Sequence, residues 1–223
     1  MKLTIKICGL STEEAIDAAI DAGADMVGLN FFPPSPRYVT LERAGQLAAR
    51  ARGRAAVVAV TVDMTDTGLA EIVDVVKPDW IQAHGKESPA RVAEMKKRFS
   101  RRVVKAIGIG EASDLGRTEA YRGIADGFLL DAKPPKGAIL PGGNGEPFDW
   151  MILQDFRPGV PWLLSGGLNA GNVGFALRVA GAPGIDVSSG VEVAPGRKDP
   201  NLIRAFIAAA RRVAPVEPEP AAG

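Results

Sequence analysis

The chain has 223 residues, of which 46% are hydrophobic and 24% are charged, the mix of an ordinary globular protein. Its 27 lysines and arginines against 26 acidic residues leave a net charge of +1, which offers no electrostatic reason to expect nucleic acid or an anionic membrane as a partner. One cysteine (Cys8) and one histidine (His84) exclude an internal disulfide and a structural zinc site of the Cys/His type, which needs four such ligands.

The chain also lacks the sequence signals of a membrane or secreted protein. Its longest apolar run, residues 55–62, is strand length and far short of the roughly 18 residues that span a bilayer. The N-terminal residues have no apolar signal-peptide core. We therefore expect a cytoplasmic protein.

Short apolar runs alternate with longer amphipathic stretches along the whole chain. The runs predict strands at 4–9, 26–31, 55–62, 80–85, 103–109, 127–132, 161–167 and 184–191. The stretches predict helices at 13–22, 41–52, 66–76, 89–99, 113–121, 170–180 and 201–213, with a short helix near 150–156. Residues 133–147 form a Gly/Pro-rich loop, and the Pro/Glu/Ala tail 214–223 is predicted to be disordered.

Eight strand–helix units of roughly 27 residues each favour a particular α/β fold, a single-domain (β/α)8 TIM barrel over residues 1–213. Strict alternation requires parallel strands joined by right-handed crossovers. A doubly wound open sheet is the alternative, but even repeats with polar residues at the strand ends favour closure.

In such a barrel the carboxyl ends of the strands face the active site. Cys8, His84 and Asp131 each fall at such an end, and Arg37 lies in the loop after the second strand. The only cysteine and the only histidine are therefore both predicted to lie on the catalytic rim.

Glycine- and serine-rich turns follow the last two strands. Gly166 and Gly167 lie in the first turn, and Ser189 and Gly190 in the second. Phosphate is held by several backbone N–H groups, and glycine allows the close approach. Ordinary turns also contain Gly and Ser, but the pair in adjacent units, where barrels usually hold phosphate, favours phosphate binding.

The rim residues offer an acid and a base. A thiolate can act as a general base when its pKa falls below the usual value of about 8.5, so Cys8 is a candidate, although a free cysteine is more often a small core residue. Asp131 follows three apolar residues and can be a general acid, because burial raises a carboxyl pKa, or simply a cap.

The other polar candidates have weaker assignments. Arg37 can fork onto a carboxylate, and His84 can orient or bind substrate, although each also fits a structural role. Asp63 fits a hydrogen bond to the rim scaffold, and Lys105, inside the fifth strand, is either a barrel-interior lysine or a solvated or paired one.

Seven segments in order resemble the phosphoribosylanthranilate isomerase family and span almost the whole chain except the tail. They lie at residues 6–10, 32–39, 82–85, 130–132, 148–150, 164–168 and 184–192. The first two together are quite specific, whereas the last two are shared among phosphate-binding barrels. Residues 136–145 resemble the family's Gly-rich loop, with Gly143-Asn144-Gly145 in place of its usual Gly-Thr-Gly-like portion.

The resemblance implies an Amadori rearrangement of N-(5-phosphoribosyl)anthranilate in tryptophan biosynthesis. Asp131 would protonate the furanose ring oxygen, and Cys8 would remove the C2′ proton. Arg37 would pair with the anthranilate carboxylate, and His84 would lie near the substrate. Gly166, Gly167, Ser189 and Gly190 would hold the phosphate. The partner would be this small molecule, with no cofactor or metal, and the protein would be a monomer or homodimer.

Three alternatives remain. One is a sister barrel: the aminoaldose isomerase of histidine synthesis carries Asp where Cys8 stands, and an indole-forming synthase needs a catalytic lysine set for which only Lys105 is available. Another is a non-catalytic phosphate-binding barrel, which has no need of both Cys8 and Asp131. A nucleic-acid module is disfavoured by the net charge and by the lack of a basic aromatic patch.

Overall fold

The strands close into a parallel barrel, as the sequence predicts. The computed structural model describes residues 2–133, 142 and 147–213, so the predicted tail 214–223 and most of the loop 133–147 lie outside the described residues. The barrel order is β1-β2-β3-β4-β5-β6-β7-β8. The strands are β1 (Thr4–Cys8), β2 (Met26–Asn30), β3 (Ala56–Thr61), β4 (Trp80–Ala83), β5 (Arg102–Ile109), β6 (Gly127–Ala132), β7 (Trp162–Leu164) and β8 (Gly184–Val187).

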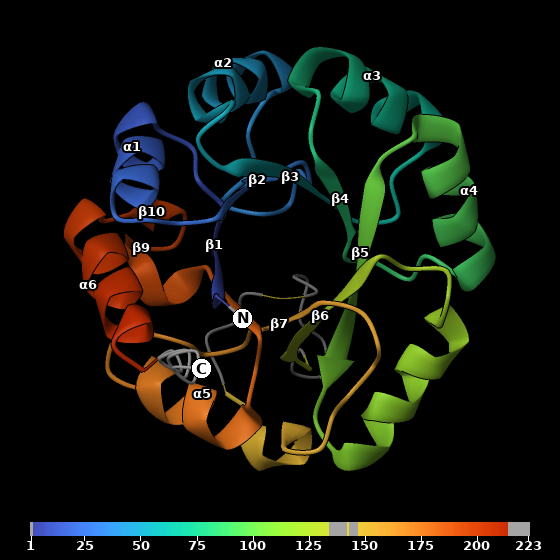
Figure 1. Cartoon of the computed structure of the whole chain (residues 1–223). Coiled ribbons are helices and arrows are strands. Elements are labelled where there is room, and N and C mark those ends of the chain that lie inside the picture. The colour runs from blue at the N-terminus through green and yellow to red at the C-terminus, as the bar shows by residue number, and fades with distance from the viewer. Residues whose placement is uncertain (1, 134–141, 143–146, 214–223) are drawn as a thin grey trace, which may run out of the picture.

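Helical segments surround the strands in a ring, which Figure 1 shows nearly end-on. The α-helices are α1 (Glu13–Asp21), α2 (Leu41–Ala51), α3 (Asp66–Val76), α4 (Pro89–Phe99), α5 (Val173–Ala180) and α6 (Pro200–Arg211). The first four begin at a Thr or Ser whose hydroxyl accepts a backbone N–H, as Thr12 does from Ala15 at 3.2 Å. None of the helices within the described residues is long and apolar enough to cross a membrane.

Closure depends on the pairing of the first strand with the last. Lys6 of β1 lies opposite Asp186 of β8, and Thr4 lies opposite Gly184. A Cβ at Gly184 would lie 3.0 Å from the Thr4 carbonyl oxygen and would overlap the Leu163 side chain, so glycine suits the close packing of β8 between β1 and β7.

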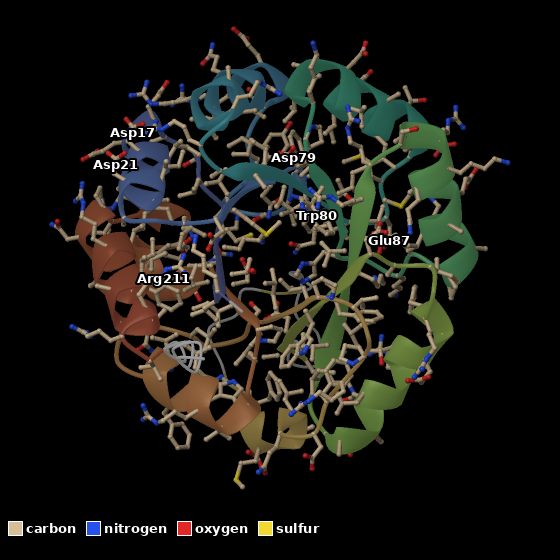
Figure 2. The ribbon with its side chains drawn as sticks, viewed as in Figure 1. Asp17, Asp21, Asp79, Trp80, Glu87 and Arg211 are labelled. Carbon is tan, nitrogen blue, oxygen red and sulfur yellow. The ribbon has the colours of Figure 1, made fainter. Side chains whose placement is uncertain are left out.

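Two layers of side chains follow from the alternation along each strand. Ile5 and Ile7 of β1 point outward into the large core between the barrel wall and the helices. Lys6 and Cys8, the alternate residues, point into the barrel. Asp17 and Asp21 lie on the outer side of α1, whereas Trp80 lies inside the ring of helices (Figure 2).

Several predicted elements differ from the structure. The helix predicted at 113–121 is the 3-10 helix η1 (Ala112–Tyr121). Gly116 in its middle disfavours an α-helix, and the Thr118 hydroxyl donates to the Leu115 carbonyl oxygen. The short helix near 150–156 is also 3-10, η2 (Trp150–Leu153). The helix predicted from residue 170 begins at Val173, because the Asn169 side chain accepts the N–H of Gly171 and forms a turn.

The strand predicted at 184–191 ends at Val187 and is followed by elements that were not predicted. After β8 come a 3-10 turn, η3 (Ser189–Val191), and a small hairpin of β9 (Glu192–Ala194) and β10 (Arg197–Lys198). The predicted strand 161–167 is likewise reduced to β7. The shortening leaves the residues after β7 and β8 in turns, which are the segments that carry the predicted phosphate site.

Candidate active site

A pocket lies at the carboxyl ends of the strands. Its lining includes seven of the eight predicted site residues: Cys8, Arg37, His84, Asp131, Gly166, Gly167 and Ser189. Gly190 is the exception. It lies beside Ser189, and a Cβ there would overlap the Leu168 carbonyl oxygen. Closure of the barrel therefore brings together side chains that are more than 120 residues apart in the chain.

Cys8 ends β1 and is 8% exposed on the wall of this pocket. Burial raises the pKa of its thiol, and the Asp186 carboxylate raises it further, whereas the ammonium groups of Lys6 and Lys198 act in the opposite direction. The pKa of the resting thiol thus lies above its ordinary value. For Cys8 to act as a thiolate base, the two lysines and the bound substrate have to lower this pKa.

Asp131, near the end of β6, is 4% exposed and lies on the pocket wall with His84. One carboxylate oxygen accepts the N–H of Ala132 at 2.9 Å, and the other lies 3.5 Å from His84 Nε2. His84 Nδ1 in turn contacts the Gln82 side-chain amide nitrogen at 2.6 Å. A Cβ at Gly142 would overlap the Asp131 carboxylate and lie 2.6 Å from His84 Nε2, so glycine is needed there. One face of the carboxyl is therefore held by the protein.

Arg37 was expected to bind a carboxylate, and within the protein it binds that of Glu192. Its Nε and Nη2 lie 2.8 and 2.9 Å from the two Glu192 oxygens, in the bidentate fork that suits a guanidinium. Lys198 Nζ lies 2.7 Å from the same carboxylate. Despite burial, these two cations lower the pKa of Glu192 below its usual value. The hairpin β9–β10 thereby fixes the direction of the Arg37 guanidinium on the pocket wall.

The turns after β7 and β8 lie at the pocket, which Gly166, Gly167 and Ser189 line. Gly166 and Gly167 have φ of +89° and +66°, which a side chain would strain. A Cβ at Gly166 would lie 2.7 Å from the Ala132 nitrogen. Within the described residues, the N–H groups of Gly166, Gly167, Ser189 and Gly190 donate to no protein acceptor. Such adjacent, unpaired N–H groups are suited to binding an anion.

Replacing Gly9 is expected to destabilise the protein, because its backbone has φ of +74° and a Cβ would lie 2.7 Å from Arg37 Cδ. Gly53 provides a matched control, since it has φ of +77° and no atom within 4 Å of its Cβ position. Both alanine variants suffer the backbone strain of about 1–2 kcal/mol. Gly9→Ala should lower the free energy of unfolding by about 1–3 kcal/mol more than Gly53→Ala, as measured by urea denaturation. Equal losses would contradict this account of the contact.

Lys105 and Asp63 do not line the pocket. Lys105 points outward from β5, where its Nζ lies 2.9 Å from Glu87 Oε2 and 2.8 Å from the Gly85 carbonyl oxygen. It is therefore a paired lysine and not a barrel-interior one. Asp63 connects the loops after β3 and β4, because its carboxylate accepts the N–H of Lys86 at 2.7 Å.

Four charged groups around Cys8 and Arg37 were not predicted. They are Lys6, Asp186, Glu192 and Lys198, all buried or nearly so. The signal for the first two was present: a lysine and an aspartate each interrupt an apolar strand at a position that alternation directs into the barrel. No local pattern marks Glu192 and Lys198, whose environment depends on the hairpin.

Comparison with known proteins gives a consistent result. A family model described as N-(5′-phosphoribosyl)anthranilate (PRA) isomerase matches residues 5–209. The N-(5′-phosphoribosyl)anthranilate isomerase of Mesorhizobium japonicum is 58% identical over 211 residues, covering 95% of this chain and 96% of the relative. The protein of the same name from Rhodopseudomonas palustris is 57% identical over 211 residues, covering 95% and 97%.

Solved structures show the same similarity in three dimensions. The phosphoribosyl anthranilate isomerase of Thermotoga maritima has a TM-score of 0.85 and 33% identity, covering 94% of this chain and 99% of its own. A second structure is a phosphoribosyl anthranilate isomerase in complex with reduced 1-(o-carboxyphenylamino)-1-deoxyribulose 5-phosphate, with a TM-score of 0.82, 31% identity and coverage of 94% and 99%. A third, described as monomers of the dimeric T. maritima enzyme, has a TM-score of 0.81, 32% identity and the same coverage.

Proposed function

Because this chain belongs to the N-(5′-phosphoribosyl)anthranilate isomerase family, we propose that it converts N-(5-phosphoribosyl)anthranilate to 1-(2-carboxyphenylamino)-1-deoxyribulose 5-phosphate, an Amadori rearrangement in L-tryptophan biosynthesis. One observation carries the proposal. A single pocket holds a thiol from β1, a carboxyl from β6 and unpaired backbone N–H groups after β7 and β8. An aldose–ketose isomerisation of a phosphorylated sugar needs those three functions.

Asp131 is the proposed general acid. It donates its proton to the furanose ring oxygen while the C1′–O bond breaks, and the lone pair of the anthranilate nitrogen forms the protonated imine. The Ala132 N–H and His84 hold the carboxyl on the pocket wall, which fixes the direction of this transfer. His84 is thereby proposed to lie near the substrate and to position the acid.

Cys8 is the proposed general base. Its thiolate takes the proton from C2′, the C2′–H electron pair forms the C1′=C2′ bond, and the imine electrons return to nitrogen. The resulting enolamine tautomerises to the ketone by losing the O2′ proton and gaining one at C1′. The proposal is supported by the position of Cys8 on the pocket wall. Cys8 ends β1, which pairs with β8, and β8 pairs with β7 in the closed barrel.

The phosphate is proposed to lie against the turns after β7 and β8. The N–H groups of Gly166, Gly167, Ser189 and Gly190 supply the donors, and the three glycines have no side chain to stand between their N–H groups and the ligand. Because the substrate is held at the phosphate and at the anthranilate, the ribose between them lies within reach of both reacting groups.

Arg37 is proposed to bind the anthranilate carboxylate, and Arg37→Ala is expected to raise KM by about 10- to 100-fold, the worth of a hydrogen bond between charged groups. The turnover number kcat should change much less, because the anthranilate carboxylate takes no part in the bonds that break and form. Steady-state kinetics with the purified variant measures both values.

A matched control separates this effect from general destabilisation. Arg43 of α2 also forms a bidentate ion pair, with Glu13, but lies outside the pocket. Arg43→Ala should leave KM at the wild-type value. If Arg37→Ala had the wild-type KM as well, the carboxylate would have to bind elsewhere.

The proposed activity is tested by following the loss of phosphoribosylanthranilate fluorescence with the purified protein. Substrate loss that depends on enzyme concentration is expected. The aminoaldose substrate of the histidine-pathway isomerase is the comparison, since the related barrel carries Asp in place of Cys8. No turnover of phosphoribosylanthranilate would overturn the proposal, and turnover of the aminoaldose alone would reassign the enzyme to that sister activity.

A further inference from the structure

A buried ion pair lies inside the barrel below Cys8. Lys6 Nζ of β1 is 2.8 Å from Asp186 Oδ1 of β8, and the two side chains are 1% and 5% exposed. Interior positions around them are mostly apolar, including Val58, Val104 and Leu129. Such layers in (β/α)8 barrels are usually filled by branched apolar residues. Since a well-packed apolar pair is often as stable as a buried ion pair or more so, stability alone does not account for these charges.

The side chains of Lys6 and Cys8 lie on the same face of β1. They are two residues apart on β1, so both side chains point into the barrel. Both lie over Gly28 of β2: a Cβ there would be 3.0 Å from Cys8 Sγ and 3.3 Å from Lys6 Cε. Because Gly28 has no side chain, the aliphatic part of Lys6 and the Cys8 thiol can both pack against its backbone.

The charged groups around Cys8 come from three strands. Lys6 lies beside it on β1, Asp186 on β8 and Lys198 on β10, and Lys6 is the strongest influence that lowers the pKa of the thiol. The neighbouring residues on β2 and β3 are Gly28 and apolar valines. Arg37 packs over the adjacent Gly9, and its guanidinium is bound by Glu192, as is Lys198. His84 and Asp131 line the pocket from β4 and β6.

We propose that Lys6 is a positioning residue that stabilises the thiolate form of Cys8, and that Asp186 holds the Lys6 ammonium group in place beneath it. The proposal rests on the proposed function in one respect, that Cys8 acts as the base. When Cys8 takes the C2′ proton its negative charge disappears, and Asp186 then keeps Lys6 from becoming an unpaired buried cation. The pair thus supports both protonation states of the thiol.

The single cysteine makes the test direct, because any thiolate signal of the protein comes from Cys8. The thiol pKa is measured without substrate, from the pH dependence of thiolate ultraviolet absorbance and of the alkylation rate by iodoacetamide. Lys6→Met, which keeps the stem but removes the charge, is expected to raise this pKa by about one unit or more. The low-pH limb of kcat/KM should move to higher pH by the same amount, with KM unchanged at the pH optimum.

A double variant keeps the test valid if an unpaired Asp186 prevents folding. Lys6→Met/Asp186→Asn leaves no buried charge unpaired. Its thiol pKa should also be higher than that of the wild type, because Lys6 influences the thiol more than Asp186 does.

The chain offers a matched control pair. Lys105 and Glu87 form a buried pair with an Nζ–Oε2 distance of 2.9 Å and 3% exposure of each side chain, on the outer face of β5. Glu87 lies inside the ring of helices near β5 (Figure 2). Lys105→Met/Glu87→Gln should lose thermal stability and keep the wild-type thiol pKa.

Two outcomes distinguish the inference from a purely structural role. A raised thiol pKa in the Lys6 variants, with none in the control, supports it. A thiol pKa that is unchanged in a folded Lys6 variant overturns it, and the pair is then structural. Because the titration needs no substrate, failure of the isomerase assay would overturn the proposed function and leave this result standing.

Discussion

Asp131→Asn is expected to lower kcat by about 10²- to 10⁴-fold, the usual contribution of general acid catalysis. The amide is nearly isosteric and can still accept the N–H of Ala132, which lies 2.9 Å from the carboxylate. It cannot give up a proton to the ring oxygen, so ring opening slows while binding is retained. Stopped-flow and steady-state fluorescence with phosphoribosylanthranilate measure kcat and KM separately.

Asp63→Asn is the control for this variant. Asp63 lies on the same rim, and its φ of +46° is one that asparagine tolerates well. Since its carboxylate accepts the backbone N–H of Lys86 and does not line the pocket, kcat should stay near the wild-type value. Wild-type turnover by Asp131→Asn would remove Asp131 from the role of acid.

Cys8→Ser is expected to lower kcat by a similar factor of about 10²–10⁴. The hydroxyl group occupies nearly the same volume but is far too weakly acidic to supply an anionic base at neutral pH. The fold should persist, because the side chain is small and the polar groups of Lys6 and Asp186 lie beside it. Thermal unfolding and the loss of substrate fluorescence are measured on the same preparation.

Two further measurements sharpen the Cys8 result. With Cys8→Ser, substrate deuterated at C2′ should react more slowly than unlabelled substrate does, because proton removal then limits the rate. Cys8→Asp should recover part of the lost turnover, since a carboxylate is ionised at neutral pH. Near-normal turnover by Cys8→Ser would contradict the assignment of Cys8 as the base.

Much of the fold was predictable because it depends on local patterns. The eight apolar runs and their intervening amphipathic stretches predicted the (β/α)8 barrel, and the closed order of β1 to β8 confirms it. Predictions of helix type and length were less accurate. In η1 the Thr118 hydroxyl donates to the Leu115 carbonyl oxygen, and before α5 the Asn169 side chain accepts the N–H of Gly171. Average helix propensity does not describe such side-chain-to-backbone hydrogen bonds.

The candidate site was predictable in position but not in its contacts. Cys8, His84 and Asp131 were predicted at strand ends, and parallel strands bring all such ends to one face. The partners of these residues were not predictable in the same way. Arg37 and Glu192 are 155 residues apart in the chain, and Lys6 and Asp186 are 180 apart.

The sequence by itself determined the barrel, the face that carries the pocket and the scarcity of candidates: one thiol and one imidazole. Those results follow from periodicity and residue count, which need no knowledge of distant contacts. Only the tertiary structure decided that Cys8 lies over a buried Lys6–Asp186 pair and that Arg37 is fixed by Glu192 of a short hairpin. Barrel closure creates these contacts by joining β1 to β8, and the charge that surrounds the thiol depends on that closure.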